Sequence, residues 1–420
     1  MRSYIVAMAI LYCCFHLTTT RVVAQWVVLP INQTNKLSAS SFLNKDIGFV
    51  AAGREILRTV DGGLRWTSVP VSNSVWSISA AKQSQVAFAV GEAIYRTIDA
   101  GETWDSIYKQ GETGLFGSTV DVSFSSTTYG CILGSVLEFT TNGGSSWNVG
   151  EAVPLPFSDP LSVFALSERI AYAGGFFSEY MVGALMKTTD GGITWRHIIN
   201  HLPPFGGAPN GIRAIHFFSE SVGIIAGPLD PPQSPSPPWR PHVLRTNDGG
   251  QTWQMPEFKF WHDVNTIAFA DSFRGFIGDT AGNIYSTTDG GITWKNDNVP
   301  SSGRSINSIC VAGGSRVFAV GDSGLILRFD LPVSVDEHSI TASPLPTLRL
   351  LPNPATGSVR VETGGAEIAT VNVVDILGKV LDVPRSGATL DTSMLPAGMY
   401  VVMARVNNAV MSAMLMICNP

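Results

Sequence analysis

The sequence predicts an all-β protein, and three observations support that class. Charged residues make up only 14% of the 420 residues, whereas 42 are Gly and 25 are Pro. Short runs of Val, Ile and Phe alternate with clusters of Gly, Asn, Asp and Ser, a pattern typical of strands joined by turns. One octapeptide also recurs six times, so the fold is expected to repeat a small β unit.

The first 24 residues have the pattern of a signal peptide. Arg2 supplies a positive charge, Ile5 to Leu17 are mostly apolar, and Val22-Val23-Ala24 offers small residues for cleavage. The apolar run is too short to span a bilayer, and no later run reaches that length. We therefore expect residues 1–24 to be a signal peptide and the mature chain to have no transmembrane segment.

Cysteine and charge usage restrict the chemistry further. Cys131, Cys310 and Cys418 remain after the leader, and none has a CxxC or other metal-type spacing. Export would permit disulfides, but Cys131 and Cys310 lie in apolar runs far apart, so we expect unpaired buried thiols. The state of Cys418 is left open.

The net charge of −6, without a cluster of Lys or Arg, argues against a nucleic-acid partner. HExxH, GxSxG and P-loop motifs are absent. No metal and no cofactor are therefore predicted.

The repeated octapeptide predicts the architecture. Its copies are TVDGGLRW (59–66), TIDAGETW (97–104), TTNGGSSW (140–147), TTDGGITW (188–195), TNDGGQTW (246–253) and TTDGGITW (287–294). Successive tryptophans are 38, 43, 48, 58 and 41 positions apart. A period near forty is that of one four-stranded blade of a β-propeller.

Each octapeptide has the chemistry of a hairpin turn. The acid or amide at its third position can accept hydrogen bonds from following backbone N–H groups, and the glycines tolerate positive φ. The closing Trp begins the next strand and can pack between blades. We interpret these turn residues as structural: Asp61, Asp99, Asn142, Asp190, Asp248 and Asp289.

The two ends of the repeat region complement each other. Gly324 to Arg328 matches the strand before an octapeptide, yet none follows it, and Trp26 to Pro30 matches the strand after one, yet none precedes it. We predict that the N-terminal strand completes the last blade, which removes two exposed sheet edges. The count is then seven blades within a propeller domain of residues 25–332.

These octapeptides resemble the Asp-box (BNR) repeat. Together with the preceding Ile-x-Arg-Thr strand, they look most like the propellers of the photosystem II stability and assembly factor family. The resemblance covers about three quarters of the chain and implies a propeller fold without implying an activity.

The last part of the chain is patterned differently. Residues 333–346 have the composition of a linker. Beyond them come Leu351-Pro-Asn-Pro-Ala355, Val371 to Lys379 and Leu395 to Val402. In this order the three segments resemble the type A C-terminal sorting domain of the type IX secretion system. The resemblance implies a small Ig-like β-sandwich over residues 347–420 and recognition by the type IX secretion machinery. The last strand, Met411 to Ile417, departs from the family by lacking its usual lysine.

Known enzymes that carry Asp boxes are poorly matched. Sialidases use an arginine triad and an Arg-Ile-Pro or Arg-Leu-Pro motif before the first box, which is absent here. The arginines that recur at one repeat position are better interpreted as structural: Arg58, Arg96, Arg245 and Arg328. Xyloglucanases need two propellers, and the DGG turns lack the spaced carboxylates of a calcium loop.

Two long loops form the leading candidate for a ligand site. Residues 175–183 and 227–242 interrupt neighbouring blades and should lie on the face opposite the octapeptides. They offer aromatic and cationic groups suited to a peptide or a sugar: Phe176, Phe177, Tyr180, Trp239 and Arg240. The connection 196–211 between these blades is also long. The alternative is that the proline-rich loop is a tolerated insertion.

A second candidate lies along the first strand of each blade. One aligned position, expected at the mouth of the central channel, is polar in six of seven blades: Ser38, Trp76, Asp121, Ser162, Arg213, Asn265 and Asn307. Arg213, Asp121 and Trp76 could form a shallow pocket there. The alternative is simple hydration of the channel.

The sequence therefore favours an exported, non-enzymatic propeller that binds a protein or glycan at or beyond the cell surface. A secreted glycoside hydrolase or lyase is the alternative. A role in photosystem assembly is disfavoured, because that process takes place at an internal membrane.

Overall fold

The computed structural model describes most of the chain outside the leader and the linker. The described residues are 25–109, 120–152, 159–177, 182–199, 211–227, 243–331, 348–353, 355–363, 368–375, 379–406 and 409–417. The predicted signal peptide (1–24) and linker (333–346) lie outside them.

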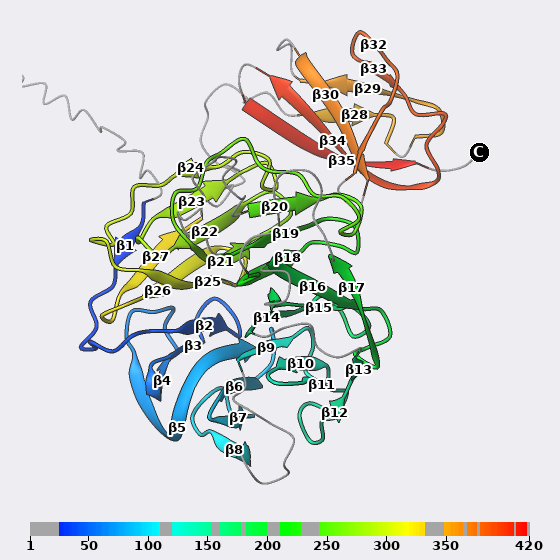
Figure 1. Cartoon of the computed structure of the whole chain (residues 1–420). Helices are drawn as coiled ribbons and strands as arrows, with labels where there is room; N and C mark the ends of the chain where they lie inside the picture. The colour runs from blue at the N-terminus through cyan, green and yellow to red at the C-terminus, as the bar shows by residue number, and fades with distance from the viewer. Residues whose placement is uncertain are drawn as a thin grey trace, which may run out of the picture.

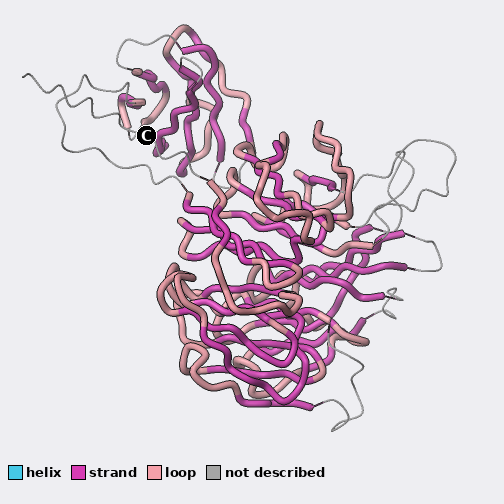
Figure 2. Tube along the Cα trace, turned by 90° about the vertical axis from the view of Figure 1, so that its left-hand side faces the viewer, coloured by secondary structure: helices cyan, strands magenta, loops and turns pink. Residues whose placement is uncertain are grey.

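The described residues form an all-β structure, which confirms the predicted class. They contain 35 strands in eight sheets, and only strands and loops occur among them (Figure 2). Six sheets precede residue 332 and two follow residue 347. The sheets are antiparallel except for one two-residue strand, β13, which joins β17 in parallel.

The first sheet has seven strands because one long strand belongs to two repeats. Strand β5 runs without a turn from the end of the first octapeptide into the next repeat. Its first part pairs with β4 and its last part with β6. The strands are β2 (Ala39–Phe42), β3 (Gly48–Ala51), β4 (Gly53–Thr59), β5 (Thr67–Ala80), β6 (Ala87–Gly91), β7 (Ala93–Thr97) and β8 (Asp105–Lys109).

The next four sheets follow the repeat in chain order. They are β9 (Asp121–Phe124), β10 (Gly130–Leu133), β11 (Leu137–Thr140) and β12 (Asn148–Val149); then β13 (Glu151–Ala152), β14 (Asp159–Ala165), β15 (Ala171–Phe177), β16 (Val182–Thr188) and β17 (Thr194–Ile199); then β18 (Ala214–Phe217), β19 (Gly223–Ala226) and β20 (Val243–Thr246); then β21 (Val264–Phe269), β22 (Gly275–Asp279), β23 (Ile284–Thr287) and β24 (Lys295–Asn296). In the β18–β20 sheet the outer strand is reduced to one bridge, Arg245 with Gln254.

The sixth sheet joins the two ends of the repeat region. It contains β25 (Ile306–Ala312), β26 (Arg316–Gly321), β27 (Ile326–Asp330) and, outermost, β1 (Val27–Val28). Val27 pairs with Arg328 and Val28 with Leu327, so β1 lies beside the last strand of the repeat region (Figure 1). The predicted pairing of the N-terminal strand is confirmed.

Apolar cores lie between successive sheets. Phe88 of β6 stacks on Phe124 of β9 with ring centroids 3.8 Å apart. The last sheet packs in the same way on the first, because Phe318 of β26 stacks on Phe42 of β2 at 4.3 Å. Burial of this apolar surface is the main stabilising contribution to such a fold. Cys131 and Cys310 are unpaired, as predicted; Cys131 is also buried, whereas Cys310 is only half-buried. Cys418 lies outside the described residues.

The last two sheets share one apolar core of their own. One sheet contains β28 (Arg349–Leu351), β29 (Ser358–Glu362), β33 (Thr389–Asp391) and β32 (Arg385–Ser386), and the other contains β31 (Val380–Leu381), β30 (Ile368–Asp375), β34 (Gly398–Val406) and β35 (Ala409–Ile417).

The three motifs of this region have structural roles. The side-chain oxygen of Asn353 accepts a 2.9 Å hydrogen bond from the Met416 N–H, and the Ala355 N–H donates to the Met416 carbonyl. The first motif thus fastens to the last strand. The other two motifs supply β30 and β34, which pair along their length.

Candidate functional site

The six octapeptide turns share one hydrogen-bond pattern. The first Thr hydroxyl donates to the acid or amide at the third position over 2.7–3.0 Å. The N–H of the seventh residue donates to that same oxygen over 2.8–3.0 Å. The fifth residue, always Gly, donates its N–H to the Thr hydroxyl. The acids are thus engaged inside their own turns.

The glycine at the fifth position of each turn has a positive φ, and Gly63 shows two reasons why glycine is required there. Gly63 has a φ of 83°, which side chains with a Cβ rarely adopt. A Cβ there would also lie 2.6 Å from the ring of Phe318. The turn therefore lies directly on the core of the neighbouring sheet.

The octapeptide tryptophans and the recurrent arginines connect neighbouring repeats. Trp147 packs edge-on against the stacked rings of Phe88 and Phe124. The Arg58 Nε–H donates to the Ala100 carbonyl over 2.7 Å, and the Arg245 Nε–H donates to the Gly290 carbonyl over 2.9 Å. Each of these two arginines holds the octapeptide turn of the next repeat, which supports their interpretation as structural.

The turn hydrogen bonds favour the ionised acids. Hydrogen bonds from the hydroxyls of Thr103 and Thr97 lower the pKa of Asp99 to about 2. At Asp190, burial acts to raise the pKa, but the hydrogen bonds from Thr194 and Thr188 together outweigh it and lower the pKa. Lowered values of this kind are typical of carboxylates that accept several hydrogen bonds.

The long-loop face is described only at its base. Phe176 is the second-to-last residue of β15, where it pairs with Gly183 of β16, and it is half-buried. Phe177 pairs with Val182. Tyr180, Trp239 and Arg240 lie outside the described residues, so their role stays a prediction.

Arg213 lies beside this base. The Ile212 N–H donates to the Gly175 carbonyl over 3.3 Å, so the residue before Arg213 contacts the residue before Phe176. An Arg213 guanidinium nitrogen lies 3.4 Å from the Asn265 side-chain oxygen and 3.6 Å from a carboxylate oxygen of Asp263. Arg213 and Asn265, two residues of the aligned polar position, are therefore in contact.

Asp121, predicted with Arg213 at the channel mouth, links three sheets. One carboxylate oxygen accepts a 2.6 Å hydrogen bond from the Ser77 hydroxyl, and the other accepts a 2.8 Å bond from the Val163 N–H. Burial raises its pKa, while these bonds oppose the rise. Because both of its oxygens accept hydrogen bonds from neighbouring sheets, the Asp121 carboxylate connects these sheets.

Other polar residues of the same aligned ring also join sheets. The Asn265 amide donates to the Ile306 carbonyl over 3.0 Å, and the Asn307 amide donates to the Leu37 carbonyl over 2.9 Å. Their hydrogen bonds explain the polar character of this position without a ligand. Neither hydration nor binding at the ring is tested by these contacts.

An aromatic cluster on the inner strands was not expected. The His216 ring lies 5.2 Å from Phe164, 5.1 Å from Phe218 and 5.2 Å from Phe269. Burial, with a smaller contribution from the Lys82 charge, lowers the pKa of His216 to about 3. No local sequence signal could reveal this cluster, because three different sheets supply it.

Glu138 is another buried titratable group that the sequence did not single out. Its side chain is 3% exposed on β11, and burial raises its pKa to about 7. It occupies a position taken by Tyr or Leu in other repeats, such as Tyr95 and Leu57.

Within the described residues, no three His, Cys, Asp or Glu side chains gather in a way that could hold a metal ion. A helix long and apolar enough to cross a membrane is likewise not found in that part of the chain.

Comparison with known proteins places the two parts of the chain. Residues 349–418 match the family model of the secretion system C-terminal sorting domain. This match confirms the resemblance of the C-terminal motifs, and it marks a protein that type IX secretion exports to the cell surface or beyond.

The larger part is similar to propellers of the photosystem II assembly factor type. The chain is 26% identical over 181 residues to the photosystem II assembly lipoprotein Ycf48 of Synechococcus sp. (strain CC9902). That alignment covers 42% of this chain and 48% of the relative, so it spans about half of that protein's length.

Solved structures show the same fold. YCF48 bound to D1 peptide aligns with a TM-score of 0.57 and 16% identity, over 74% of this chain and 98% of that one. PorZ, an essential bacterial surface component of the type IX secretion system of Porphyromonas gingivalis, aligns with a TM-score of 0.55 and 13% identity. That alignment covers 93% of this chain and 61% of PorZ.

Proposed function

We propose that this chain is an exported, non-enzymatic β-propeller that binds a protein or glycan at the cell surface or outside the cell. The observation that carries the proposal is the sorting-domain match directly after a propeller. The propeller provides a rigid scaffold for loops, and the sorting domain delivers it.

The proposed propeller has seven blades within residues 25–332. Two of them share the seven-stranded sheet through β5, four follow in chain order, and β1 completes the seventh beside β27. Packing of the last sheet on the first supports a closed ring. We further propose residues 1–24 as the signal peptide, residues 333–346 as the linker, and an Ig-like sandwich for residues 347–420.

A binding role is favoured over catalysis by the site. The acids of the octapeptide turns, which we assign to the Asp-box type, are engaged inside their turns. Asp121 is engaged between sheets. One similar structure is that of YCF48 bound to D1 peptide, and another is that of a bacterial surface component. Of the two ligand classes, the first of these structures favours a peptide.

We place the ligand on the face of loops 175–183, 196–211 and 227–242. The hydrogen bond between the Ile212 and Gly175 backbones supports this choice, because it joins the residues that precede Arg213 and Phe176. An aromatic ring and a guanidinium are frequent anchors of peptide and sugar ligands.

The test is a pull-down from surface and culture fractions with the purified propeller, followed by affinity measurement on the captured ligand. The double variants Phe176→Ala with Arg213→Ala, and Trp239→Ala with Arg240→Ala, should weaken binding. Lys187→Ala, whose ammonium lies over Tyr172, is the control. Equal affinity in all folded variants would remove the ligand from this face. Hydrolysis of carbohydrate substrates by the wild-type chain would favour the glycoside hydrolase instead.

A further inference from the structure

One strand of the sorting domain has an incompletely paired edge. Strand β30 pairs along its length with β34, but on its other side it pairs with β31 only at Val373 and Val374. Within the described residues, no strand is registered against that side of residues 368–372. We call these five residues the open edge; at its end, the Ile368 carbonyl accepts a 3.4 Å hydrogen bond from the Arg385 guanidinium.

The hydrogen-bonding groups of the open edge follow from the ladder. The Asp375 N–H donates to the Lys379 carbonyl on the β31 side over 3.0 Å. Because N–H and C=O groups alternate direction along an antiparallel strand, Val373 and Val371 point to that same side. The Val371 N–H and C=O therefore face the open edge and can pair with an added strand.

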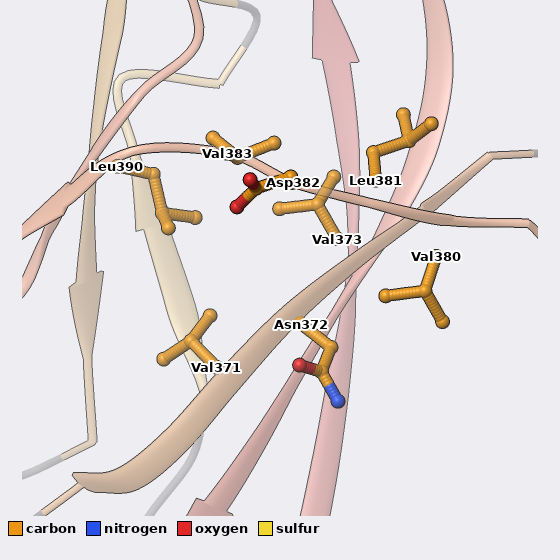
Figure 3. Close-up of a pocket in the computed structure, with 8 residues that line it drawn as sticks. All are labelled: Val371, Asn372, Val373, Val380, Leu381, Asp382, Val383 and Leu390. Carbon is orange, nitrogen blue, oxygen red and sulfur yellow. The ribbon is translucent and has the colours of Figure 1, made fainter.

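A hollow of about 290 Å³ lies at this edge. Val373 and Leu390 at its walls are buried and belong to the core between the two sheets. Figure 3 shows valine and leucine side chains surrounding the space. Its full lining is Val371, Asn372, Val373, Val380, Leu381, Asp382, Val383 and Leu390. The core thus reaches the surface where the chain leaves β31.

The rim of the hollow carries apolar and acidic groups. Val380 is 59% exposed. Asp382 is exposed, and among the described residues it makes no hydrogen bond or ion pair. A fitting partner is an extended segment that pairs with Val371, inserts an apolar side chain and presents Lys or Arg to Asp382.

We propose that the open edge and the hollow receive such a segment from the type IX secretion machinery. The inference rests on the proposed function, since it assigns the place where the sorting domain is recognised. All residues that line the hollow lie within the matched range 349–418.

A second copy of this chain fits the site less well. Its edge strand β35, Ala409–Ile417, contains no Lys or Arg to meet Asp382. Its edge strand β28, Arg349–Leu351, has three residues against the five of the open edge. A segment of the type IX secretion machinery is therefore the better occupant of the open edge and the hollow.

The experiment expresses the full chain in a bacterium that has type IX secretion and measures the protein outside the cell and in the periplasm. Val371→Pro removes the N–H that faces the open edge, where proline is tolerated, and it also replaces a side chain that lines the hollow. Val383→Phe fills the hollow, and Asp382→Lys reverses the rim charge. Each should lower export about tenfold, equal to about 1.4 kcal/mol of docking energy.

Two controls make the outcome decisive. Met394→Lys adds a lysine at an 86% exposed position away from the hollow and should export normally. Thermal unfolding of each purified variant checks the fold. If proline at 371 prevents folding, the exposed Asp382→Lys variant decides the question.

Normal export of the folded variants would overturn this inference and leave the proposed function standing. Normal export after deletion of residues 347–420 would overturn the proposed delivery itself. If the wild-type chain dimerises and Val371→Pro abolishes dimerisation with export unchanged, the edge belongs to a second copy and the inference is wrong.

Discussion

The indole N–H of Trp26 donates a 3.1 Å hydrogen bond to a carboxylate oxygen of Asp297, across 271 positions of sequence. The other oxygen of Asp297 accepts a 2.6 Å bond from Ser286. Trp26 is 3% exposed and lies edge-on to Phe276. The N-terminal strand is thus anchored both to the last sheet of the repeat region and to the sheet before it.

Replacing Trp26 by Ala should destabilise the propeller strongly. The change removes a buried indole and leaves a cavity, which costs about 3–5 kcal/mol. Urea unfolding of the purified chain, followed by circular dichroism, measures the loss. Val27→Ala, on an exposed neighbour, should cost much less. Equal effects of the two substitutions would contradict the proposed closure by β1.

Asp190→Ala should lower stability without affecting the ligand. Asp190 accepts hydrogen bonds from Thr188, the Thr194 N–H and the Thr194 hydroxyl, and their loss should cost about 1–2 kcal/mol. Thr189→Ala, on the exposed neighbour, is the matched control. Loss of ligand binding with an unchanged melting temperature would mean that this turn has a direct functional role.

Stability should fall in acid as the turn carboxylates become protonated. The pKa of Asp99 is lowered from 3.8 to about 2 in the folded chain, so its stabilising contribution is complete above about pH 4 and is lost as the pH falls towards 2. Asp99→Asn should make the melting temperature less dependent on pH across this window. Asn142 already occupies the equivalent position in another turn, so the amide is compatible with the fold. An unchanged pH profile in the variant would count against the role of these hydrogen bonds.

Glu138 should have the opposite pH dependence. Its pKa is raised from 4.5 to about 7 in the folded chain. Folding therefore favours the protonated acid, and stability falls as the pH rises from about 4.5 to 7, by about 3 kcal/mol at most. Glu138→Gln should remove this dependence in melts between pH 5 and 8. Glu151→Gln, at an exposed glutamate, should leave it unchanged. A wild-type melting temperature that does not vary over this range would show that Glu138 does not titrate there.

Much of the fold could be predicted because its signals are local. Each octapeptide closes its own turn through hydrogen bonds between residues two to four positions apart. Eight consecutive residues are therefore enough to predict the turn. The unmatched strands at Trp26 and Leu325 predicted their own pairing for a related reason. A half-repeat leaves backbone groups that only the other half can satisfy.

Tertiary structure alone decided which polar residues are engaged and which surfaces stay open. Asp121 belongs to a polar position that recurs along the repeats, but its partners Ser77 and Val163 come from other sheets. The rings of His216, Phe164 and Phe269 likewise come from three sheets. No sequence pattern identifies these partners. The open edge at Val371 exists because the chain leaves β31 after two residues. Such features depend on long-range packing, in which the free energy of each contact is set by neighbours distant in sequence.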